Sequence, residues 1–195
     1  MIEALSINVS EVITHAESMG GDGITRYRSP DGALYSVYPP TSFLTFAPWI
    51  YMVPPFKPQN VLMLGYGGGT TAGLIRLLYG EVEITGVDLG FVDNRYGVHQ
   101  IQADAQGWVH HGGYYDCTIV DVFDGQGAAG FIDNYDFVTQ IARITRRCLI
   151  VHAEGSKDLG IYEQFFTRLQ VMNIRGHQII YFKKPEDTTQ YFPDA

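Results

Sequence analysis

An apolar run leads directly into a cluster of glycines in the sequence VLMLGYGGGTT (Val61–Thr71). Val61–Leu64 has the length and composition of a buried strand, and Thr70–Tyr79 has the apolar spacing of a helix. Glycine permits positive φ and lets a ligand approach the backbone, and the following helix directs its free N–H groups at that ligand. This order is typical of nucleotide binding, although a tight turn without a ligand is the alternative. The predicted binding residues are Gly65, Gly67, Gly68 and Gly69.

The order strand, turn, helix repeats along the rest of the chain. The expected strands are Val61–Leu64, Val82–Val87, Val98–Ile101, Asp116–Val120, Cys148–His152 and Gln178–Phe182. The expected helices are Thr70–Tyr79, Ala103–Val109, Asp133–Ile144 and Leu159–Val171. Apolar strands that alternate with helices predict an α/β fold, with a mostly parallel sheet and helices on both faces. The connection from Asp88 to Val98 is too short for a full covering helix.

The first 40 residues follow a different pattern. Ile7–Ser18 could form a short helix, and Ile24–Arg28 and Ala33–Tyr38 read as two strands around a Ser-Pro-Asp-Gly turn. We therefore expect an N-terminal helix and β-hairpin appendage at residues 1–40. The nucleotide-binding domain is expected at residues 41–195.

Composition narrows the classes of partner. Of the 195 residues, 46% are hydrophobic and 17% charged, which is typical of a globular protein. The net charge is −8 and no basic run is present, so no nucleic-acid partner is expected. The longest apolar stretch, Ser42–Phe56, contains three prolines and is shorter than the roughly 20 residues of a membrane helix. No membrane association is therefore expected.

The cysteines and histidines show no metal-ligand spacing. Cys117 and Cys148 lie inside apolar runs, as core residues do, which favours a reducing cytoplasm. His110 and His111 are adjacent, so their side chains diverge, and no acid or cysteine is spaced to complete a tetrahedral site. We predict no metal.

Two acidic residues follow the second and third predicted strands. Asp88 ends the second strand roughly 20 residues after the glycines, where a carboxylate can accept hydrogen bonds from ribose hydroxyls. A solvated strand-end aspartate is the alternative, and the spacing favours ribose. Asp104 opens the helix after the third strand. It could accept from an adenine amino group or act as a helix N-cap, and both roles are compatible if different oxygens are used.

Asp121 and Asp124 leave the carboxyl end of the Asp116–Val120 strand. Ligands of open α/β sheets bind at this end of the strands. Beside a sulfonium or an amine, one carboxylate can anchor the cation and the other can take a proton. The alternative is a pair of ordinary loop aspartates before Gly125.

Together these motifs resemble the spermidine synthase-like proteins, which have the Rossmann-like class I methyltransferase fold. The resemblance covers about Tyr35–His152. Its pieces are the glycine loop, Gly86-Val87-Asp88, Ala103-Asp104-Ala105, and Tyr115-Asp116 through Asp121 to Gly125.

The resemblance implies a transferase that moves an aminopropyl group from decarboxylated S-adenosylmethionine (SAM) to an amine. By resemblance, Asp121 is the base and Asp124 holds the amine, while Asp88 binds ribose and Asp104 binds adenine. The family carries an aspartate where Gly68 stands and a final antiparallel pair of strands, for which the segment after Phe182 is short.

Two alternatives stay open beside aminopropyl transfer. Gly68 favours a SAM-dependent methyltransferase, since no aminopropyl ammonium would be held there. A non-catalytic nucleotide-binding protein of the same fold is the second. The expected partner is a small-molecule amine or other small acceptor, and a homodimer through the hairpin is an open alternative to a monomer.

Overall fold

The computed structural model describes residues 24–28, 34–40, 48–90, 96–123, 127–154 and 159–185. The strands are β1 (Thr25–Arg28), β2 (Leu34–Tyr38), β3 (Asn60–Leu64), β4 (Glu83–Asp88), β5 (His99–Gln102), β6 (Tyr115–Val120), β7 (Thr145–Glu154), β8 (Thr167–Ile174) and β9 (His177–Lys183). The α-helices are α2 (Thr70–Tyr79), α3 (Ala105–Trp108) and α4 (Tyr135–Ile144). The 3₁₀ helices are η1 (Pro48–Met52), η2 (Val109–His111), η3 (Gly130–Asp133) and η4 (Gly160–Gln164).

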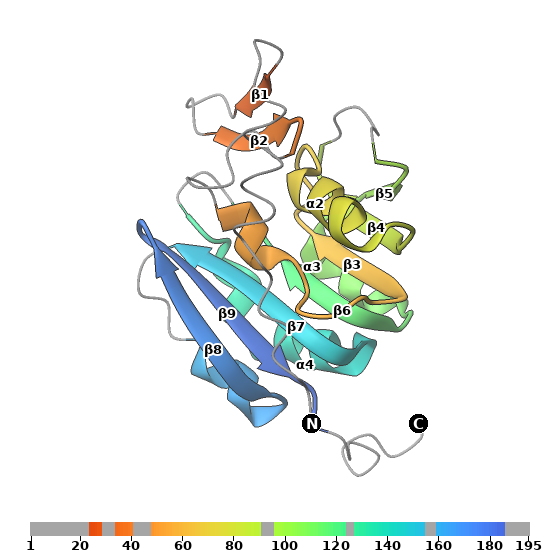
Figure 1. Ribbon diagram of the computed structural model, residues 1–195. Coiled ribbons are helices and arrows are strands. Elements are labelled where there is room, and N and C mark those ends of the chain that lie inside the picture. Colours follow the sequence, from red (N-terminus) through yellow and green to blue (C-terminus); the bar gives the residue numbers. More distant parts are fainter. Residues whose placement is uncertain are drawn as a thin grey trace.

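Seven strands form one sheet in the order β5-β4-β3-β6-β7-β9-β8 (Figure 1). Strands β3 to β7 pair in parallel with one another, and β9 runs antiparallel to both β7 and β8. The chain moves from β3 out to β5 and then returns to β6 on the other side of β3. This reversal makes a topological switch point between β3 and β6, where ligands of such sheets bind. The predicted mostly parallel α/β sheet is confirmed.

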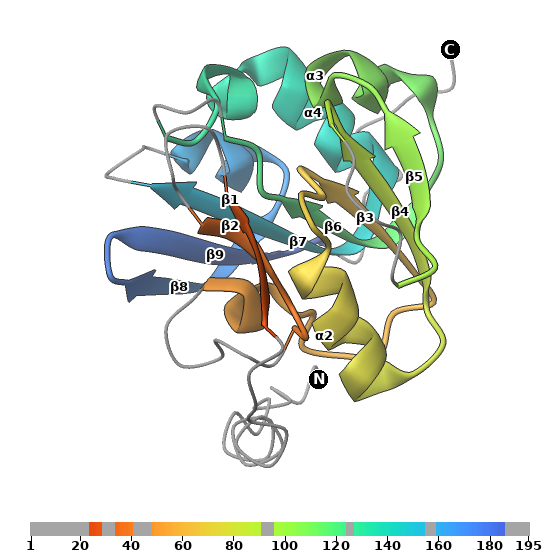
Figure 2. The ribbon, with the colours of Figure 1, turned by 90° about the horizontal axis from the view of Figure 1, so that it is seen from above.

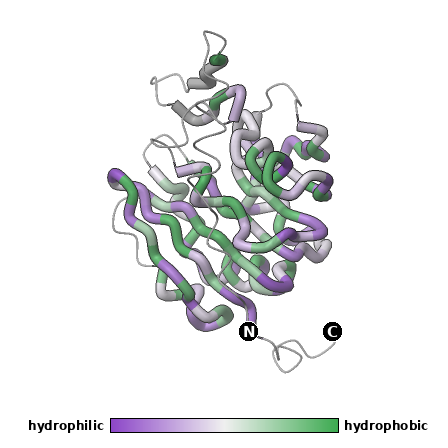
Figure 3. Tube along the Cα trace, viewed as in Figure 1, coloured by the Kyte–Doolittle hydropathy of each residue, from purple (hydrophilic) through white to green (hydrophobic). Residues whose placement is uncertain are grey.

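Helices cover both faces of the sheet. Figure 2 shows α2 and η1 on one side and α3 and α4 on the other. Neighbouring strand residues point to opposite faces, so Met63 packs in the core under α2 while Leu62 and Leu64 pack in the core under α4. Buried apolar side chains on both faces explain why these strands read as continuous hydrophobic runs. Figure 3 shows this hydrophobic centre and the more hydrophilic outer strand β8.

The N-terminal hairpin is anchored to the start of α2. Strands β1 and β2 pair antiparallel, as predicted. Thr70 Oγ1 accepts a hydrogen bond from Val37 N (2.8 Å), donates to Val37 O (3.2 Å), and lies 2.5 Å from Ser36 Oγ. Ser36 and Val37 are fully buried. Because Thr70 directly follows the glycine cluster, β2 lies beside that turn.

The connection between β4 and β5 has no helix in its described part, residues 89–90 and 96–98. Its end is fixed to α2 by Arg76, whose guanidinium donates to the carbonyl oxygens of Tyr96 and Gly97. Gly73 leaves room for Tyr96, because a Cβ at position 73 would overlap the tyrosine ring. These contacts pack the connection against α2 directly.

The predicted helix Leu159–Val171 is wrong. Only Gly160–Gln164 is helical, as the 3₁₀ helix η4, and the second half belongs to strand β8. Arg175 and Gly176 both have positive φ, 53° and 91°, as a two-residue type I′ hairpin turn requires. This turn pairs β8 with β9, and the long ladder outweighs the local helical spacing. The final antiparallel pair of strands is therefore present, formed before residue 184.

Several other predictions have mixed outcomes. The predicted helix Ile7–Ser18 lies outside the described residues, and the division of the chain at residue 40 stays a prediction. Cys117 and Cys148 are both buried free cysteines, and burial raises the pKa of the Cys117 thiol. No helix in the described part of the chain is long and apolar enough to cross a membrane.

Candidate active site at the carboxyl edge of the sheet

The glycine turn connects β3 to α2 through three residues with positive φ: Gly65 (82°), Gly67 (53°) and Gly69 (78°). A Cβ at Gly65 would overlap the carbonyl oxygen of Asp121, and a Cβ at Gly69 would overlap the Tyr66 ring. The packing of the chain itself therefore requires glycine at both positions. Their identity does not by itself indicate a ligand. Gly68 is buried in the same turn.

Asp88 holds this turn from the neighbouring strand. Its Oδ2 accepts from Gly67 N (2.8 Å) and its Oδ1 accepts from Gly90 N (3.1 Å). A carboxylate offers about four acceptor positions, so two further hydrogen bonds can be accepted. The predicted ribose acid thus lies against the predicted glycine loop and has a structural role there.

Asp104 caps α3, since its Oδ1 accepts from Gln106 N (3.1 Å). The N-cap interpretation from the sequence is confirmed. Asp104 follows β5, and β4 lies between β5 and β3. It therefore lies farther along the carboxyl edge than Asp88.

Asp121 lies at the switch point. Its backbone N–H donates to Leu64 O (2.8 Å), and its carbonyl oxygen packs against Gly65. The glycine turn and Asp121 are therefore adjacent. The other predicted carboxylate, Asp124, lies outside the described residues; Phe123 and Ala128, which flank it, form an antiparallel bridge.

Two histidines that the sequence did not single out join Asp121 in one chain of contacts. Asp121 Oδ1 lies 2.6 Å from His152 Nδ1, and His152 Nε2 lies 2.9 Å from His177 Nδ1. His177 Nδ1 also lies 3.5 Å from Glu154 Oε1. The side chain of His152 is only 5% exposed, whereas that of His177 is 30% exposed. The buried ring thus connects a carboxylate to a partly exposed ring.

The strand directions bring these residues together. His152 and Glu154 end the parallel strand β7, and His177 begins the antiparallel strand β9, so all three lie at the carboxyl edge. Glu154 pairs with His177 across the ladder, and His152 is two residues before Glu154 on the same face. The Phe123 ring packs on His152 with ring centroids 4.8 Å apart. The one sequence pattern that could have indicated this group is His152, which ends the predicted buried strand Cys148–His152.

The surroundings of His177 favour the neutral form of its ring. Burial and the neighbouring His152 lower the pKa of His177, while Glu154 and Asp121 oppose this in part. A neutral imidazole has one ring nitrogen with a free lone pair. This end of the contact chain can therefore take up a proton.

Asp116, which the resemblance includes, lies at the opposite edge of the sheet. Its Oδ2 accepts from Gln59 N (2.8 Å) and its backbone N–H donates to Asn60 Oδ1 (2.8 Å). It ties the start of β6 to the start of β3 and is distant from the carboxyl edge.

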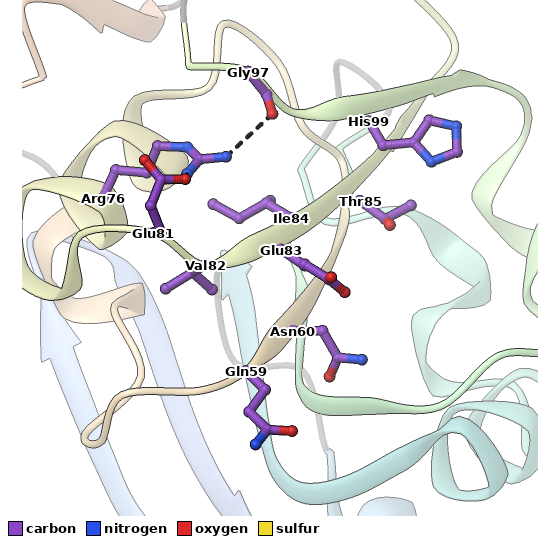
Figure 4. A pocket seen from close by; sticks show the side chains of 10 residues that line it. All are labelled: Gln59, Asn60, Arg76, Glu81, Val82, Glu83, Ile84, Thr85, Gly97 and His99. Atoms are coloured by element: carbon purple, nitrogen blue, oxygen red, sulfur yellow. Dashed lines mark hydrogen bonds and ion pairs between the residues drawn. The ribbon is translucent and has the colours of Figure 1, made fainter.

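A polar pocket of about 640 Å³ also opens at the amino end of the sheet (Figure 4). It exists because β5 begins at His99, opposite Thr85, and leaves the first residues of β4 without a partner strand on that side. Arg76 in this pocket pairs with Glu81 and donates to Gly97 O, and Figure 4 marks the second contact with a dashed line. No predicted binding or catalytic residue lines it. The lining residues are Gln59, Asn60, Arg76, Glu81, Val82, Glu83, Ile84, Thr85, Gly97 and His99.

Within the described ranges, no three side chains of histidine, cysteine, aspartate or glutamate are grouped to hold a metal ion.

No protein-family model and no curated protein sequence matches the chain. Solved structures do match its architecture. TehB from Haemophilus influenzae matches with 14% identity and a TM-score of 0.50, over 66% of this chain and 58% of TehB.

Two further structures match with a TM-score of 0.51. A probable spermidine synthase from Corynebacterium glutamicum is 15% identical, over 64% of this chain and 55% of its own. A candidate SAM-dependent methyltransferase from Streptococcus mutans is 13% identical, over 69% and 46% respectively. The fold is the Rossmann-like class I methyltransferase fold. This chain matches only about half the length of each of these three proteins, and identities this low show the fold alone.

Proposed function

We propose that the chain is a transferase that uses SAM or its decarboxylated form and passes a carbon group to a small nucleophile such as an amine. The observation that carries the proposal is the meeting of the Gly65–Gly69 turn, Asp88 and Asp121 at the switch point of this fold. Two of the matched structures are described as a probable spermidine synthase and a candidate SAM-dependent methyltransferase.

In this proposal the adenosyl group lies across the carboxyl ends of β3, β4 and β5. The remaining acceptor positions of Asp88 bind the ribose hydroxyls, and the second oxygen of Asp104 binds the adenine amino group. The sulfonium then lies near Asp121, where negative charge favours it. Asp124 holds an amine acceptor. Attack on the carbon beside sulfur forms the new bond and leaves a neutral thioether, with positioning as the main source of rate.

Two groups can be transferred, and a different observation favours each. Gly68 favours methyl transfer, since it offers no carboxylate for an aminopropyl ammonium. The order of the four motifs and the match to a probable spermidine synthase favour aminopropyl transfer. The first proposal is therefore SAM-dependent group transfer, and the donor that binds decides between the two reactions.

Isothermal titration with SAM, decarboxylated SAM and methylthioadenosine tests this proposal. We expect micromolar binding of at least one ligand, and a loss of about tenfold or more in affinity in Asp88→Asn. Asparagine keeps an oxygen for Gly67 N–H, so the contact with the glycine turn is preserved, while the exposed contact with Gly90 N–H is lost. Glu83→Ala is the matched control, because Glu83 is exposed at the other end of the same strand. No binding by any of the three ligands would contradict the proposal.

A further inference from the structure

The hydrogen bonds from Asp121 to His177 have one consistent direction. A carboxylate accepts, so His152 Nδ1 carries the hydrogen and donates to Asp121 Oδ1 across 2.6 Å. The Nε2 of a neutral His152 then has the lone pair. It accepts from His177 Nδ1–H across 2.9 Å. When both rings are neutral, this direction gives each of them the Nδ1–H tautomer.

This direction leaves the free lone pair on Nε2 of His177. Every hydrogen in this series of hydrogen bonds is donated toward Asp121. A proton can therefore enter only at His177, the residue farthest from Asp121 in the series. His177 is the more exposed ring, and His152 is enclosed by Phe123 and the sheet. Glu154 faces the Nδ1 of His177 and leaves its Nε2 unengaged within the described residues.

We propose that Nε2 of His177 takes the proton of the attacking nucleophile, and that Asp121 acts through His152 as a positioning residue. The inference rests on the transferase function proposed above. It replaces the interpretation of Asp121 as the base, because its Oδ1 is engaged by His152 at 2.6 Å. His177 would be the group that touches the acceptor.

The nucleophile forms its bond to carbon, the carbon–sulfur bond breaks with its electron pair going to sulfur, and the nucleophile's proton moves to His177 Nε2. The hydrogen on His177 Nδ1 moves to His152 Nε2. His177 is then neutral again, and the positive charge rests on His152 beside the Asp121 carboxylate. Moving the charge away from the acceptor favours release of its proton.

Nuclear magnetic resonance of protein with ¹⁵N-labelled histidine tests the inference without any ligand. Long-range ring correlations identify the tautomer of each imidazole. We expect the Nδ1–H tautomer at both His152 and His177 at pH 7.5, although free histidine in water favours Nε2–H. An Nε2–H tautomer at either ring would overturn the proposal.

Titration of Asp121→Asn gives a second readout. Asparagine can still accept from His152 Nδ1–H but carries no charge, so the pKa of His177, which the Asp121 charge raises, should fall. His110→Gln is the control, since His110 is exposed and pairs with Asp136 outside this chain of contacts. An unchanged histidine titration in Asp121→Asn would contradict the role given to Asp121.

Binding and turnover separate this inference from the proposed function. His177→Gln should bind SAM as the wild type does, and with putrescine as the probe acceptor should transfer at least about 100-fold more slowly. Unchanged turnover in His177→Gln would overturn the inference and leave the transferase proposal standing. Absence of binding of SAM, decarboxylated SAM and methylthioadenosine in the wild type would overturn the transferase proposal, whatever the tautomers.

Discussion

Two carboxylates at the same edge of the sheet are held in different ways. Asp88 accepts from two backbone N–H groups, Gly67 and Gly90, which do not titrate. Asp121 accepts from His152, which leads on to His177. The difference divides the site into a half that fixes the shape of a turn and a half that can carry a proton. Changes in pH between 5 and 8 should therefore act on the Asp121 half.

The largest effect is expected at Gly65, which lies between the two halves. Gly65→Ala adds a Cβ at positive φ and pushes it into the Asp121 carbonyl, which should lower the free energy of unfolding by about 2–5 kcal/mol. Gly80→Ala is the matched control. It has positive φ but open space around it, so backbone strain alone should cost about 1–3 kcal/mol.

Urea denaturation of the two variants measures this difference. Equal losses would show that the close approach of the glycine turn and Asp121 is unimportant, and the two halves would then be independent.

A smaller effect is expected at Thr70, which belongs only to the glycine-turn half. Thr70→Val removes a hydroxyl that bonds both backbone groups of the buried Val37, and should cost about 1–3 kcal/mol. Hydrogen exchange should rise at the β2 amides, while the histidine tautomers stay unchanged. Thr139→Val removes an exposed helix hydroxyl and should cost less than about 0.5 kcal/mol. A change of the histidine tautomers in Thr70→Val would show that the glycine-turn half and the Asp121 half are coupled.

The smallest effect is expected at Lys184, which follows β9 at the opposite edge and belongs to neither half. Burial lowers the pKa of Lys184 to about 8, and its ammonium donates to Ala142 O. The unfolded chain keeps this proton up to about pH 10.5, so the free energy of unfolding should rise with pH between about 8 and 10.

Lys184→Met should flatten this rise and stay within about 1 kcal/mol of the wild type at pH 7. Urea denaturation at pH 7, 8.5 and 9.5 measures it. A parallel rise in both proteins would assign the alkaline dependence to other groups.

Local sequence patterns predicted the glycine-turn half well. The predicted helix Thr70–Tyr79 has the observed bounds of α2, and Asp88 lies against the glycine turn that the spacing pointed to. Strand, turn and helix follow one another there, so neighbouring residues in the chain are neighbours in space. The spacing did not reveal that Gly65 and Gly69 are required by packing, because that requirement comes from Asp121 and Tyr66.

The proton-carrying half could not be predicted in the same way. Asp121 directly follows β6, while His152 and His177 lie in β7 and β9, and their contacts join residues 31 and 25 positions apart. Strand β9 lies between β7 and β8, and no local sequence pattern predicts this strand order. Because Leu159–Val171 was predicted to be helical, strand β8 was not predicted. The hairpin of β8 and β9, which places His177 at this edge, was therefore missed as well.

The position of β9 has a consequence for how the protein matures. During synthesis the glycine turn, Asp88, Asp121 and His152 all emerge before His177, and β8 can join the sheet only through β9. A nascent or truncated chain can therefore form the turn while its proton acceptor is still missing. Insertion of this single late strand between β7 and β8 closes the sheet and, in the proposed mechanism, adds the proton acceptor His177, so both should appear as one folding event.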